Sequence, residues 1–521
     1  MKKEEHRRAY EMNRRQFIKL AGASGLATLS SSSLLGLGSL TPAHAEVVGK
    51  NAEERAIKAV LELKKKMKGD TLNLMVPAGG EGQFMMAQPW WEEATGIKVK
   101  YMIVPLAQLG SKAMNLAVTR SSKIDMIFIN PYGIPDMVDG KLALDITDYV
   151  KKYNPELTGP NGVIEPLYLF AMYNGKLYGL TCDTDVNSLY VRRDWLEDAD
   201  NQKAFEDKFG YPLRVPVLYK EYFDQIKFFT NPTKGTYGAW IYASPYYAKW
   251  EFLRLLTPKG VLPFDKDMNA QIAGPEGVEA LRELIGQKDY LHPGCFTGGW
   301  DHAFKAYAEG KIWCTLTWPA LIKYCNFPEY SKIVGNIKIC PVPGNKLEDG
   351  TIFRPCQFTY GFSYSVSRYS KNPEIAYLYS QWMHSPTISS KIVPTTQGGF
   401  IDPYRYNHFT KELLEGYDPV HWEDVKEALM TNAANSYPEI QMKGGEEYMS
   451  ELDRNVIAAF QGLKKPEEAL RETAKVWEEI TERFGREGQK KQWNFLTSCY
   501  GPSLRKAMNL PDPPAWVKTL G

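Results

Sequence analysis

The sequence predicts an α/β protein, because short apolar runs that suit buried strands alternate with segments of helical spacing. Apolar runs at 71–76, 97–104 and 124–129 are separated by helical patterns at 83–95 and 107–119. A strand–helix–strand order implies right-handed crossovers and a mostly parallel sheet flanked by helices. The chain has 521 residues, of which 44% are hydrophobic, and it can therefore bury the cores of two or three domains.

The segments around the first strand follow from local patterns. Residues 46–69 are expected to form an N-terminal helical extension, because their apolar side chains recur with helical spacing. The first strand ends at Pro77 and a glycine-rich loop, and the next helix ends before Gly96. Ligands of such sheets bind beyond the carboxyl ends of the strands. The candidate binding loops are therefore 77–83, 105–106 and 130–133.

The first 45 residues predict a cleaved export signal. Residues 14–19 read RRQFIK, which resembles the twin-arginine export consensus, and residues 43–45 read AHA, which satisfies the small-x-small cleavage rule. The stretch between them is rich in serine and glycine, which disfavours the alternative of a membrane anchor. We expect a twin-arginine signal peptide over residues 1–45, cleavage after Ala45, transport by the twin-arginine translocase and a periplasmic location.

Composition and motifs exclude several classes of function. After residue 45 the chain has 56 basic and 58 acidic residues, so it lacks the basic surplus of a nucleic-acid-binding protein. The sequence has no GxxxxGK[ST], HExxH or GxSxG motif, and no GxGxxG follows a strand. No two of the seven cysteines lie within four residues, so we expect buried free thiols. We predict no cofactor and no metal.

A series of short motifs runs through the chain in a fixed order. They are WEEATGIKV at 91–99, IDMIF at 124–128, GKLALD at 140–145, NGKLYGL at 174–180, AFKAYAEGK at 303–311, VPG at 342–344 and KNPEIA at 371–376. Together they resemble family 1 of the extracellular solute-binding proteins of ABC importers, the maltose-binding-protein-like carbohydrate uptake branch. The resemblance covers roughly residues 70–485 and depends on the order of the motifs, since each one alone is weak.

The resemblance implies a two-lobed periplasmic-binding-protein fold of type II. In this fold, hinge segments join two α/β lobes, each with a mostly parallel sheet flanked by helices. By resemblance, lobe one comprises residues 70–182 and 338–393, and lobe two comprises residues 183–337 and 394–485. Residues 486–521 exceed what the family needs, and we expect an ordered C-terminal tail on the surface.

Asp183 and Asp185 form the most suggestive acidic pair. If residues 181–190 form a strand, the two side chains share one face about 7 Å apart. They could accept hydrogen bonds from ligand hydroxyls, or they could be a solvated edge. They could also be the acid and base of an inverting glycosidase, which needs about 6.5–9.5 Å between its carboxyls. By resemblance, Asp185 falls where the family places an acidic sugar-binding residue.

Aromatic residues crowd two stretches, at 240–250 and 300–318. Sugar rings present apolar C–H faces that stack on aromatic planes, although core packing explains most aromatic side chains. By resemblance, Trp318 and Tyr246 fall at ligand-stacking positions, and Tyr242 and Trp300 are further candidates. Tyr246 and Tyr247 could instead supply paired phenolate ligands, as in ferric-ion-binding relatives.

Polar and glycine residues in the loops complete the candidate ligand site. A glycine-rich loop at a helix start offers backbone N–H groups, although a simple turn is an equal alternative. The family also has a polar binding residue after its third strand, and a late glycine pair could be a hinge or a hydroxyl-binding loop. The residues concerned are Gly80, Glu81 and Gln83, then Asn130 and Tyr132, then Gly398 and Gly399.

These observations predict a periplasmic substrate-binding component of an ABC transporter that catalyses no reaction. It would be a monomer that binds a small-molecule sugar, oligosaccharide or polyol between its lobes and delivers it to the transmembrane subunits of a permease. Three alternatives remain open. They are a secreted carbohydrate-active enzyme, a ferric-ion-binding protein that uses the paired tyrosines, and the ligand-binding partner of a membrane sensor.

Overall fold

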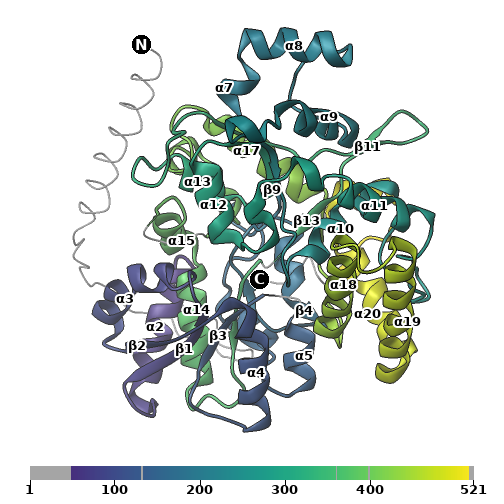
Figure 1. The fold of residues 1–521 in the computed structure, drawn as a ribbon. Coiled ribbons are helices and arrows are strands. Elements are labelled where there is room, and N and C mark those ends of the chain that lie inside the picture. The colour runs from purple at the N-terminus through teal and green to yellow at the C-terminus, as the bar shows by residue number, and fades with distance from the viewer. Residues whose placement is uncertain (1–48, 131–132, 360, 397–398, 400, 516–521) are drawn as a thin grey trace.

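The computed structural model describes residues 49–130, 133–359, 361–396, 399 and 401–515. Two sheets, each packed against helices, form a first lobe built mainly from early residues and a second lobe built mainly from residues 188–340 (Figure 1). The predicted signal peptide, Tyr132 and Gly398 lie outside the described residues. Among the described residues, no helix has both the length and the apolar character needed to span a bilayer.

The first lobe contains a five-stranded sheet of order β2-β1-β3-β14-β6. Its strands are β1 (Thr71–Pro77), β2 (Lys98–Val104), β3 (Met126–Ile129), β6 (Leu180–Thr181) and β14 (Ser363–Val366). β1 lies parallel to β2 and β3, as predicted, but β14 is antiparallel to β3 and β6. Because β6 is antiparallel to β14, it runs in the same direction as β3, so four of these five strands are parallel, as expected, and β14 alone is reversed. β14 enters from the other lobe and not through a helical crossover, so the crossover rule does not set its direction.

Helices flank this sheet as the periodicity predicts. They are α3 (Gly82–Thr95), α4 (Leu109–Val118), α5 (Ile134–Asp139), α6 (Thr147–Tyr153), α14 (Pro373–His384) and α15 (Pro386–Ile392). α3 buries Phe84, Ala87 and Trp91 and ends where Gly96 adopts the left-handed conformation. That conformation suits glycine, which has no Cβ to clash with the backbone. The predicted helix at 107–119 begins later, because residues 106–108 form a 3-10 turn.

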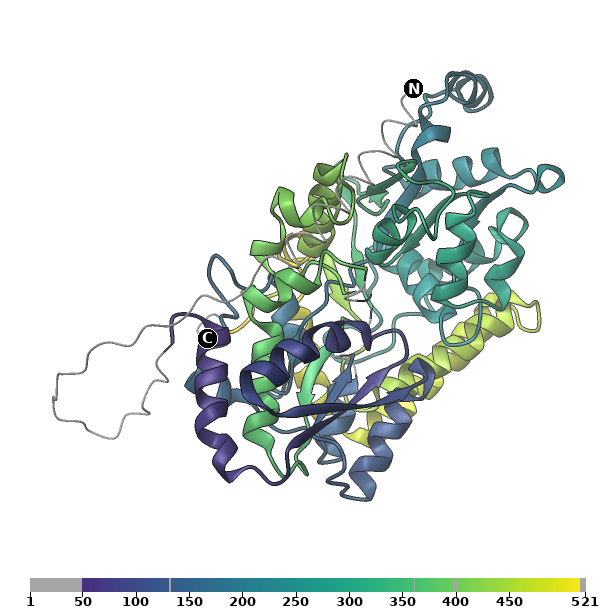
Figure 2. The same cartoon turned by 90° about the vertical axis from the view of Figure 1, so that its left-hand side faces the viewer.

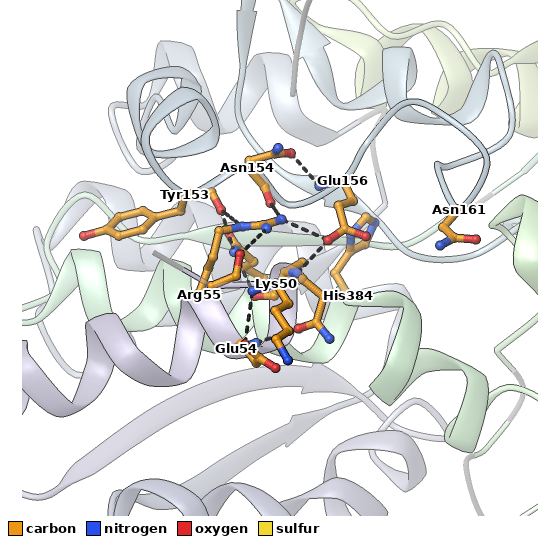
Figure 3. Close-up of polar contacts among 12 residues, drawn as sticks. Lys50, Glu54, Arg55, Tyr153, Asn154, Glu156, Asn161 and His384 are labelled. Atoms are coloured by element: carbon orange, nitrogen blue, oxygen red, sulfur yellow. Dashed lines mark hydrogen bonds and ion pairs between the residues drawn. The ribbon is translucent and has the colours of Figure 1, made fainter. Parts of the chain in front are cut away.

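The N-terminal extension is the helix α2 (Ala52–Leu63), followed by a 3-10 turn at residues 64–66. Its apolar face packs against α14. Arg55 points from α2 toward the segment after α6 (Figure 3), where its guanidinium donates to the carbonyls of Tyr153 and Asn154 and pairs with Glu156 at 2.9 Å. These bonds satisfy a buried charge, so they hold the extension in one orientation on the first lobe.

The second lobe contains a four-stranded sheet of order β10-β7-β9-β8. Its strands are β7 (Ser188–Arg192), β8 (Tyr237–Trp240), β9 (Ile312–Thr317) and β10 (Ile337–Cys340). Only the β8–β9 pair of this sheet is parallel, so the second sheet departs from the mostly parallel expectation. Helices of this lobe include α8 (Ala199–Phe209), α9 (Tyr219–Phe229), α10 (Ala248–Leu256), α11 (Pro275–Ile285), α12 (Trp300–Ala308), α13 (Ala320–Cys325) and α17 (Trp422–Ala434).

The segment that crosses from the first sheet to the second carries the acidic pair. β6 ends at Thr181 and β7 begins at Ser188, so residues 181–190 are not the single strand on which the predicted spacing of Asp183 and Asp185 depended. A second link between the lobes is the parallel pair of β13 (Cys356–Phe358) and β15 (Ser436–Pro438). The acidic pair therefore lies where the chain passes between the lobes.

The C-terminal residues form helices that are built into the molecule. They are α18 (Gly445–Phe460), α19 (Pro466–Phe484), α20 (Arg486–Ser498) and α21 (Pro502–Ala507). α18 packs on α10 and α11, and the view in Figure 2 shows these helices beside both lobes. Trp493, Tyr500 and Leu504 are buried, in contrast to the surface tail that we expected. Trp493 and Trp477 both contact the Phe264 ring, which explains why this segment joins the core.

Candidate functional site

A pocket lies between the two lobes at the carboxyl ends of strands from both sheets. It encloses about 570 Å³, including its open mouth. The first lobe supplies the loop after β1, Leu106 after β2 and Phe128 on β3, and the second lobe supplies α12 and the segment after β9. The full lining is Pro77, Ala78, Gly79, Gly80, Leu106, Phe128, Asp183, Asp185, Trp300, Phe304, Trp318, Ala320, Phe362 and Ile401.

Five aromatic side chains line the pocket. Phe128 and Phe362 stack with ring centroids 4.6 Å apart, and Trp300 meets Phe304 edge to face at 5.7 Å. Trp318 is held by its indole N–H, which donates to the hydroxyl of Thr359 at 2.9 Å. Because that polar atom is satisfied inside the protein, the part of the indole ring that lines the pocket can present an apolar face to a ligand.

Gly79 brings the backbone of the first lobe against an aromatic side chain of the second. It has a φ of 91°, and a Cβ at this position would lie 3.0 Å from the ring of Trp300. Both the left-handed conformation and the close approach require glycine. The glycine-rich loop is thus part of the contact between the lobes, whichever ligand the pocket takes.

Three carboxylates lie together beneath the pocket. Asp183, Asp185 and Asp402 are 2%, 5% and 0% exposed, and one carboxylate oxygen from each lies within 4.8 Å of the others. Asp183 accepts from the backbone N–H of Asp402, and Asp185 accepts from the N–H of Gly361, both at 2.9 Å. Among the described residues, neither oxygen of Asp402 has a hydrogen-bond partner of ordinary geometry. We call these three residues the carboxylate cluster.

A buried lysine lies next to the carboxylate cluster but donates its hydrogen bonds elsewhere. The ammonium of Lys323, on α13, donates to the carbonyls of four residues at 2.9–3.4 Å: Val393, Thr395, Gly399 and Ile401. The ammonium still interacts electrostatically with the cluster, because the charges of Asp402 and Asp183 oppose the lowering of its pKa by burial. The lysine therefore ties down the loop that leads to Asp402 and offsets part of the negative charge.

Burial dominates the titration of this group. It raises the pKa of Asp183 and of Asp185 well above the usual range of a carboxyl, and the neighbouring carboxylates raise them further. Burial also raises the pKa of Asp402 to about 7, although Lys323 opposes this shift, and it lowers the pKa of Lys323 to about 8. Desolvation disfavours every charged form here, so the site favours protons or a cation.

A second, more polar recess adjoins the pocket at Leu106. It lies between α4 and α5 of the first lobe and α18 of the second lobe. Its acidic residues are Asp136, Asp139, Glu446 and Glu447, and Lys443 pairs with Asp139 at 3.0 Å. Asp136 accepts from the backbone N–H of Gly444 at 2.7 Å. Asn130 and Tyr246 also line this recess.

The structure brings together five of the predicted site residues in the pocket: Gly80, Asp183, Asp185, Trp300 and Trp318. Asn130 and Tyr246 line the recess instead. Neither cavity is lined by Glu81, Gln83 or Tyr242. Their polar groups bond within the protein: the Glu81 carboxylate accepts from the N–H of Gly79, the Gln83 carbonyl accepts from the Tyr364 hydroxyl, and the Tyr242 hydroxyl bonds to that of Thr317. The carbonyl of Gly399 accepts from Lys323 beneath the pocket.

Sequence reasoning missed several residues of this site. Asp402 follows the glycine loop at 398–399 by only three residues, but nothing in its neighbourhood marks it as a partner of Asp183, which lies 219 residues away. Lys323 reads as an ordinary residue of an amphipathic helix. Phe128 reads as a core residue of a strand, which it also is, and Phe362, directly before β14, reads as one more apolar residue packed against the core. No local pattern could have identified these four.

Two predicted geometries change in the structure. The carboxylate oxygens of Asp183 and Asp185 lie within 4.8 Å of each other, closer than the spacing of about 6.5–9.5 Å that an inverting glycosidase needs. The rings of Tyr246 and Tyr247 meet edge to face, each also contacts Trp250, and the ammonium of Lys249 lies 4.2 Å from the centroid of Tyr246. That packing is typical of an aromatic cluster with a cation–π contact.

Comparisons with known proteins identify the fold. A solute-binding protein from Agrobacterium radiobacter K84 in complex with ribitol superposes with a TM-score of 0.67 at 19% identity, covering 79% of this chain and 99% of that one. Maltose-bound MalE3 of T. maritima superposes with a TM-score of 0.66 at 17% identity, covering 79% of this chain and 99% of that one. A solute-binding protein from Agrobacterium vitis S4 with bound D-mannitol superposes with a TM-score of 0.64 at 16% identity, covering 80% of this chain and 99% of that one.

These solved structures confirm the predicted two-lobed α/β fold class. A search of curated protein sequences gives no match. A family model described as bacterial extracellular solute-binding protein matches residues 86–400, which is more than half of the chain. The matched segment runs from α3 of the first lobe through the whole second sheet to the loop beside Asp402. The chain therefore belongs to the bacterial extracellular solute-binding protein family.

Proposed function

We propose that this solute-binding protein takes a sugar, an oligosaccharide or a polyol into the pocket between its lobes and delivers it to an ABC permease. The observation that carries the proposal is the pocket itself, whose aromatic walls stand above buried carboxylates at the ends of strands from both sheets. Apolar C–H faces of a sugar or polyol suit Trp300 and Trp318, and its hydroxyl groups suit the carboxylate oxygens.

The related structures support this ligand class. The three that superpose on this chain hold ribitol, maltose and D-mannitol, which all carry many hydroxyl groups. A further related structure, from Thermotoga lettingae TMO, holds α-D-tagatose. Closure of the two lobes around such a ligand would shield it from water and present surfaces of both lobes to a permease.

The test is a ligand screen with a matched pair of tryptophan variants. The purified protein, unfolded and refolded to remove bound ligand, is titrated calorimetrically with ribitol, D-mannitol, D-tagatose and maltose. We expect at least one of them to bind and Trp300→Ala to lower its affinity about tenfold, because stacking on an aromatic ring contributes about 1.4 kcal/mol. Trp90→Ala is the control, since Trp90 is also half-buried and lies outside the pocket.

The same screen decides against the proposal if none of these ligands binds, or if the two tryptophan variants lose affinity equally. We propose further that binding occurs without turnover, although the glycosidase alternative shares Asp183 and Asp185. Incubation of the protein with maltose at equal concentrations, followed by chromatography, is expected to return maltose alone. Release of glucose would establish an enzyme.

Location and partners complete the proposal. The RRQFIK and AHA motifs support export by the twin-arginine translocase, cleavage after Ala45 and a periplasmic location, and we propose that the protein is a monomer. The N-terminal sequence and the native mass of the exported protein test these points. A mature chain that begins at Glu46 and elutes at the mass of one copy is expected. Retention of residues 1–45 in the membrane fraction would contradict cleavage.

A further inference from the structure

We infer that the carboxylate cluster beneath the pocket is a site for a divalent cation, and that Ca²⁺ is the ion it fits. Asp183, Asp185 and Asp402 come from two segments that are far apart in sequence, 183–185 in the crossing between the sheets and 402 after the glycine loop. All three are at least nine-tenths buried. The sequence motifs and the family model assign no metal to them.

The charge at this place is poorly balanced by the protein. Three carboxylates face one buried ammonium, and Lys323 directs its hydrogen bonds to four backbone carbonyls. Burying ionised carboxylates without partners is strongly unfavourable, because the interior solvates them far less well than water does. The charge of the buried Glu439 also acts on Asp185, and one divalent cation would neutralise two of the negative charges at this place.

The hydrogen bonds leave oxygens available for an ion. Asp183 and Asp185 each use one oxygen to accept a backbone N–H, which orients the carboxylate and leaves its second oxygen for another partner. Asp402 is fully buried. The backbone N–H of Ala320 faces its carboxylate and lowers its pKa, but neither oxygen has a hydrogen bond of ordinary geometry among the described residues. A fully buried carboxylate that has no well-formed hydrogen bond and lies against two others indicates a missing ligand rather than a solvated acidic patch.

Chemistry and coordination geometry favour Ca²⁺ over other ions. The donors are all carboxylate oxygens, which suit hard cations and not zinc or copper. Three oxygens within 4.8 Å of one another can surround one cation with little movement. Ca²⁺ accepts six to eight oxygens in flexible geometry, whereas Mg²⁺ demands a near-ideal octahedron, so a cluster of carboxylates held by separate segments suits Ca²⁺ better.

Access to the site is through the pocket. Asp183 and Asp185 line it, while Asp402 lies behind them. A bound Ca²⁺ takes six to eight ligands, so positions not filled by the protein would face the pocket. Where the proposed function holds, two neighbouring hydroxyl groups of a sugar or polyol would fill those positions, and the ion would then be part of the ligand-binding surface.

The experiment measures ion binding without any sugar. The purified protein is freed of metal with EGTA and titrated with CaCl₂ while its melting temperature is followed. A separate titration with TbCl₃ follows lanthanide luminescence excited through tryptophan, since Trp300 and Trp318 line the same pocket. We expect Ca²⁺ to raise the melting temperature, EGTA to reverse the rise, and Ca²⁺ to displace the Tb³⁺ signal.

Two substitutions locate the ion. Asp402→Asn keeps the shape of the side chain and is expected to lower Ca²⁺ affinity at least tenfold, and Asp185→Asn serves if the first variant does not fold. Asp125→Asn is the control, because Asp125 is equally buried and accepts the N–H of Asn73 outside the cluster. No thermal shift and no Tb³⁺ signal at millimolar ion, or an equal response in Asp402→Asn and Asp125→Asn, would overturn the inference.

A last titration separates this inference from the proposed function. D-Mannitol and ribitol are titrated in CaCl₂ and in EGTA. Stronger binding in CaCl₂ is expected if hydroxyl groups contact the ion. Equal binding in both overturns the role of the ion in ligand binding, whereas Ca²⁺ binding with no sugar or polyol binding refutes the proposed function and leaves the ion site in place.

Discussion

Two acidic groups lie on either side of Leu106 in the space between the lobes, and they are built differently. In the carboxylate cluster, Asp183, Asp185 and Asp402 are buried under aromatic walls, and their neighbouring lysine bonds to carbonyls. In the recess, Asp139 pairs directly with Lys443, and Asp139 and Lys443 are 54% and 30% exposed. The protein shields the carboxylate cluster from water, whereas the Asp139–Lys443 pair of the recess is in contact with water.

This difference determines what each group can do. Water and Lys443 already stabilise the charge of Asp139 in the recess, so little free energy is available at that pair for a ligand. The charges of the cluster are not matched by the protein, so protons, a cation or ligand hydroxyls must complete them. Similar residue types thus form a polar contact between lobes in one place and a candidate binding site in the other.

The largest expected effect concerns Lys323. Lys323→Met removes the buried ammonium and leaves four carbonyls and three carboxylates without it, so we expect the free energy of unfolding to fall by roughly 3–5 kcal/mol. Urea denaturation at pH 7 in EGTA measures the loss. A fall below about 1 kcal/mol would mean that protons alone neutralise the cluster and that Lys323 contributes no more than an exposed ion pair.

The next effect concerns the pH dependence of the recess. Burial raises the pKa of Asp136 from 3.8 to about 6, the N–H of Gly444 opposes the shift, and the charges of Glu446 and Glu447 add to it. Because the folded-state pKa is the higher one, Asp136 contributes stability that is present below pH 4 and is lost as the pH rises through 6.

Asp136→Asn should remove this loss. Relative to the native protein, the variant is expected to gain roughly 2–3 kcal/mol of unfolding free energy between pH 4 and pH 7. Thermal or urea unfolding at these two pH values, in the same buffer, measures the difference. A constant difference at both pH values would show that the Asp136 carboxyl is solvated like Asp139.

A smaller effect separates the two cavities as ligand sites. Tyr246→Leu removes a ring from the recess, while Trp300→Ala removes one from the pocket. We expect Tyr246→Leu to leave sugar or polyol affinity within about twofold, against the loss of about tenfold from the pocket variant. Calorimetry with the ligand found in the screen measures both. A larger loss from Tyr246→Leu would place the ligand in the recess.

The smallest effect is expected at Lys443. Lys443→Met breaks an ion pair that is largely open to solvent, so the free energy of unfolding should change by less than about 1 kcal/mol, and by less still in 0.5 M NaCl. Urea denaturation at two salt concentrations measures this. A loss as large as that of Lys323→Met would show that the recess is also a desolvated site.

Local patterns were sufficient for much of the first lobe. The strand predicted at 71–76 is β1, the helix predicted at 83–95 is α3, and Gly96 ends that helix as expected. These features depend on side chains within a few residues of one another, which is the range over which periodicity and capping act. The seven cysteines, predicted as buried thiols, are buried and free.

The candidate site was only partly accessible to the same reasoning. Asp183, Asp185, Trp300 and Trp318 were predicted because carboxylates and tryptophans have a recognisable chemistry with sugars, and they do reach the pocket. Tyr242 was predicted on the same grounds and instead bonds to Thr317 behind Trp318. Nothing in the sequence distinguishes a tryptophan or tyrosine that faces a pocket from one that faces the core.

The sequence by itself determined the alternation of strands and helices, the balance of charge, and the acidic and aromatic residues from which a site could be made. Only the tertiary structure decided the antiparallel entry of β14, the burial of the C-terminal helices, and the meeting of Asp402 with Asp183 across 219 residues. Strands and helices follow from neighbours along the chain. A site follows from contacts between distant segments, and these depend on how whole lobes pack.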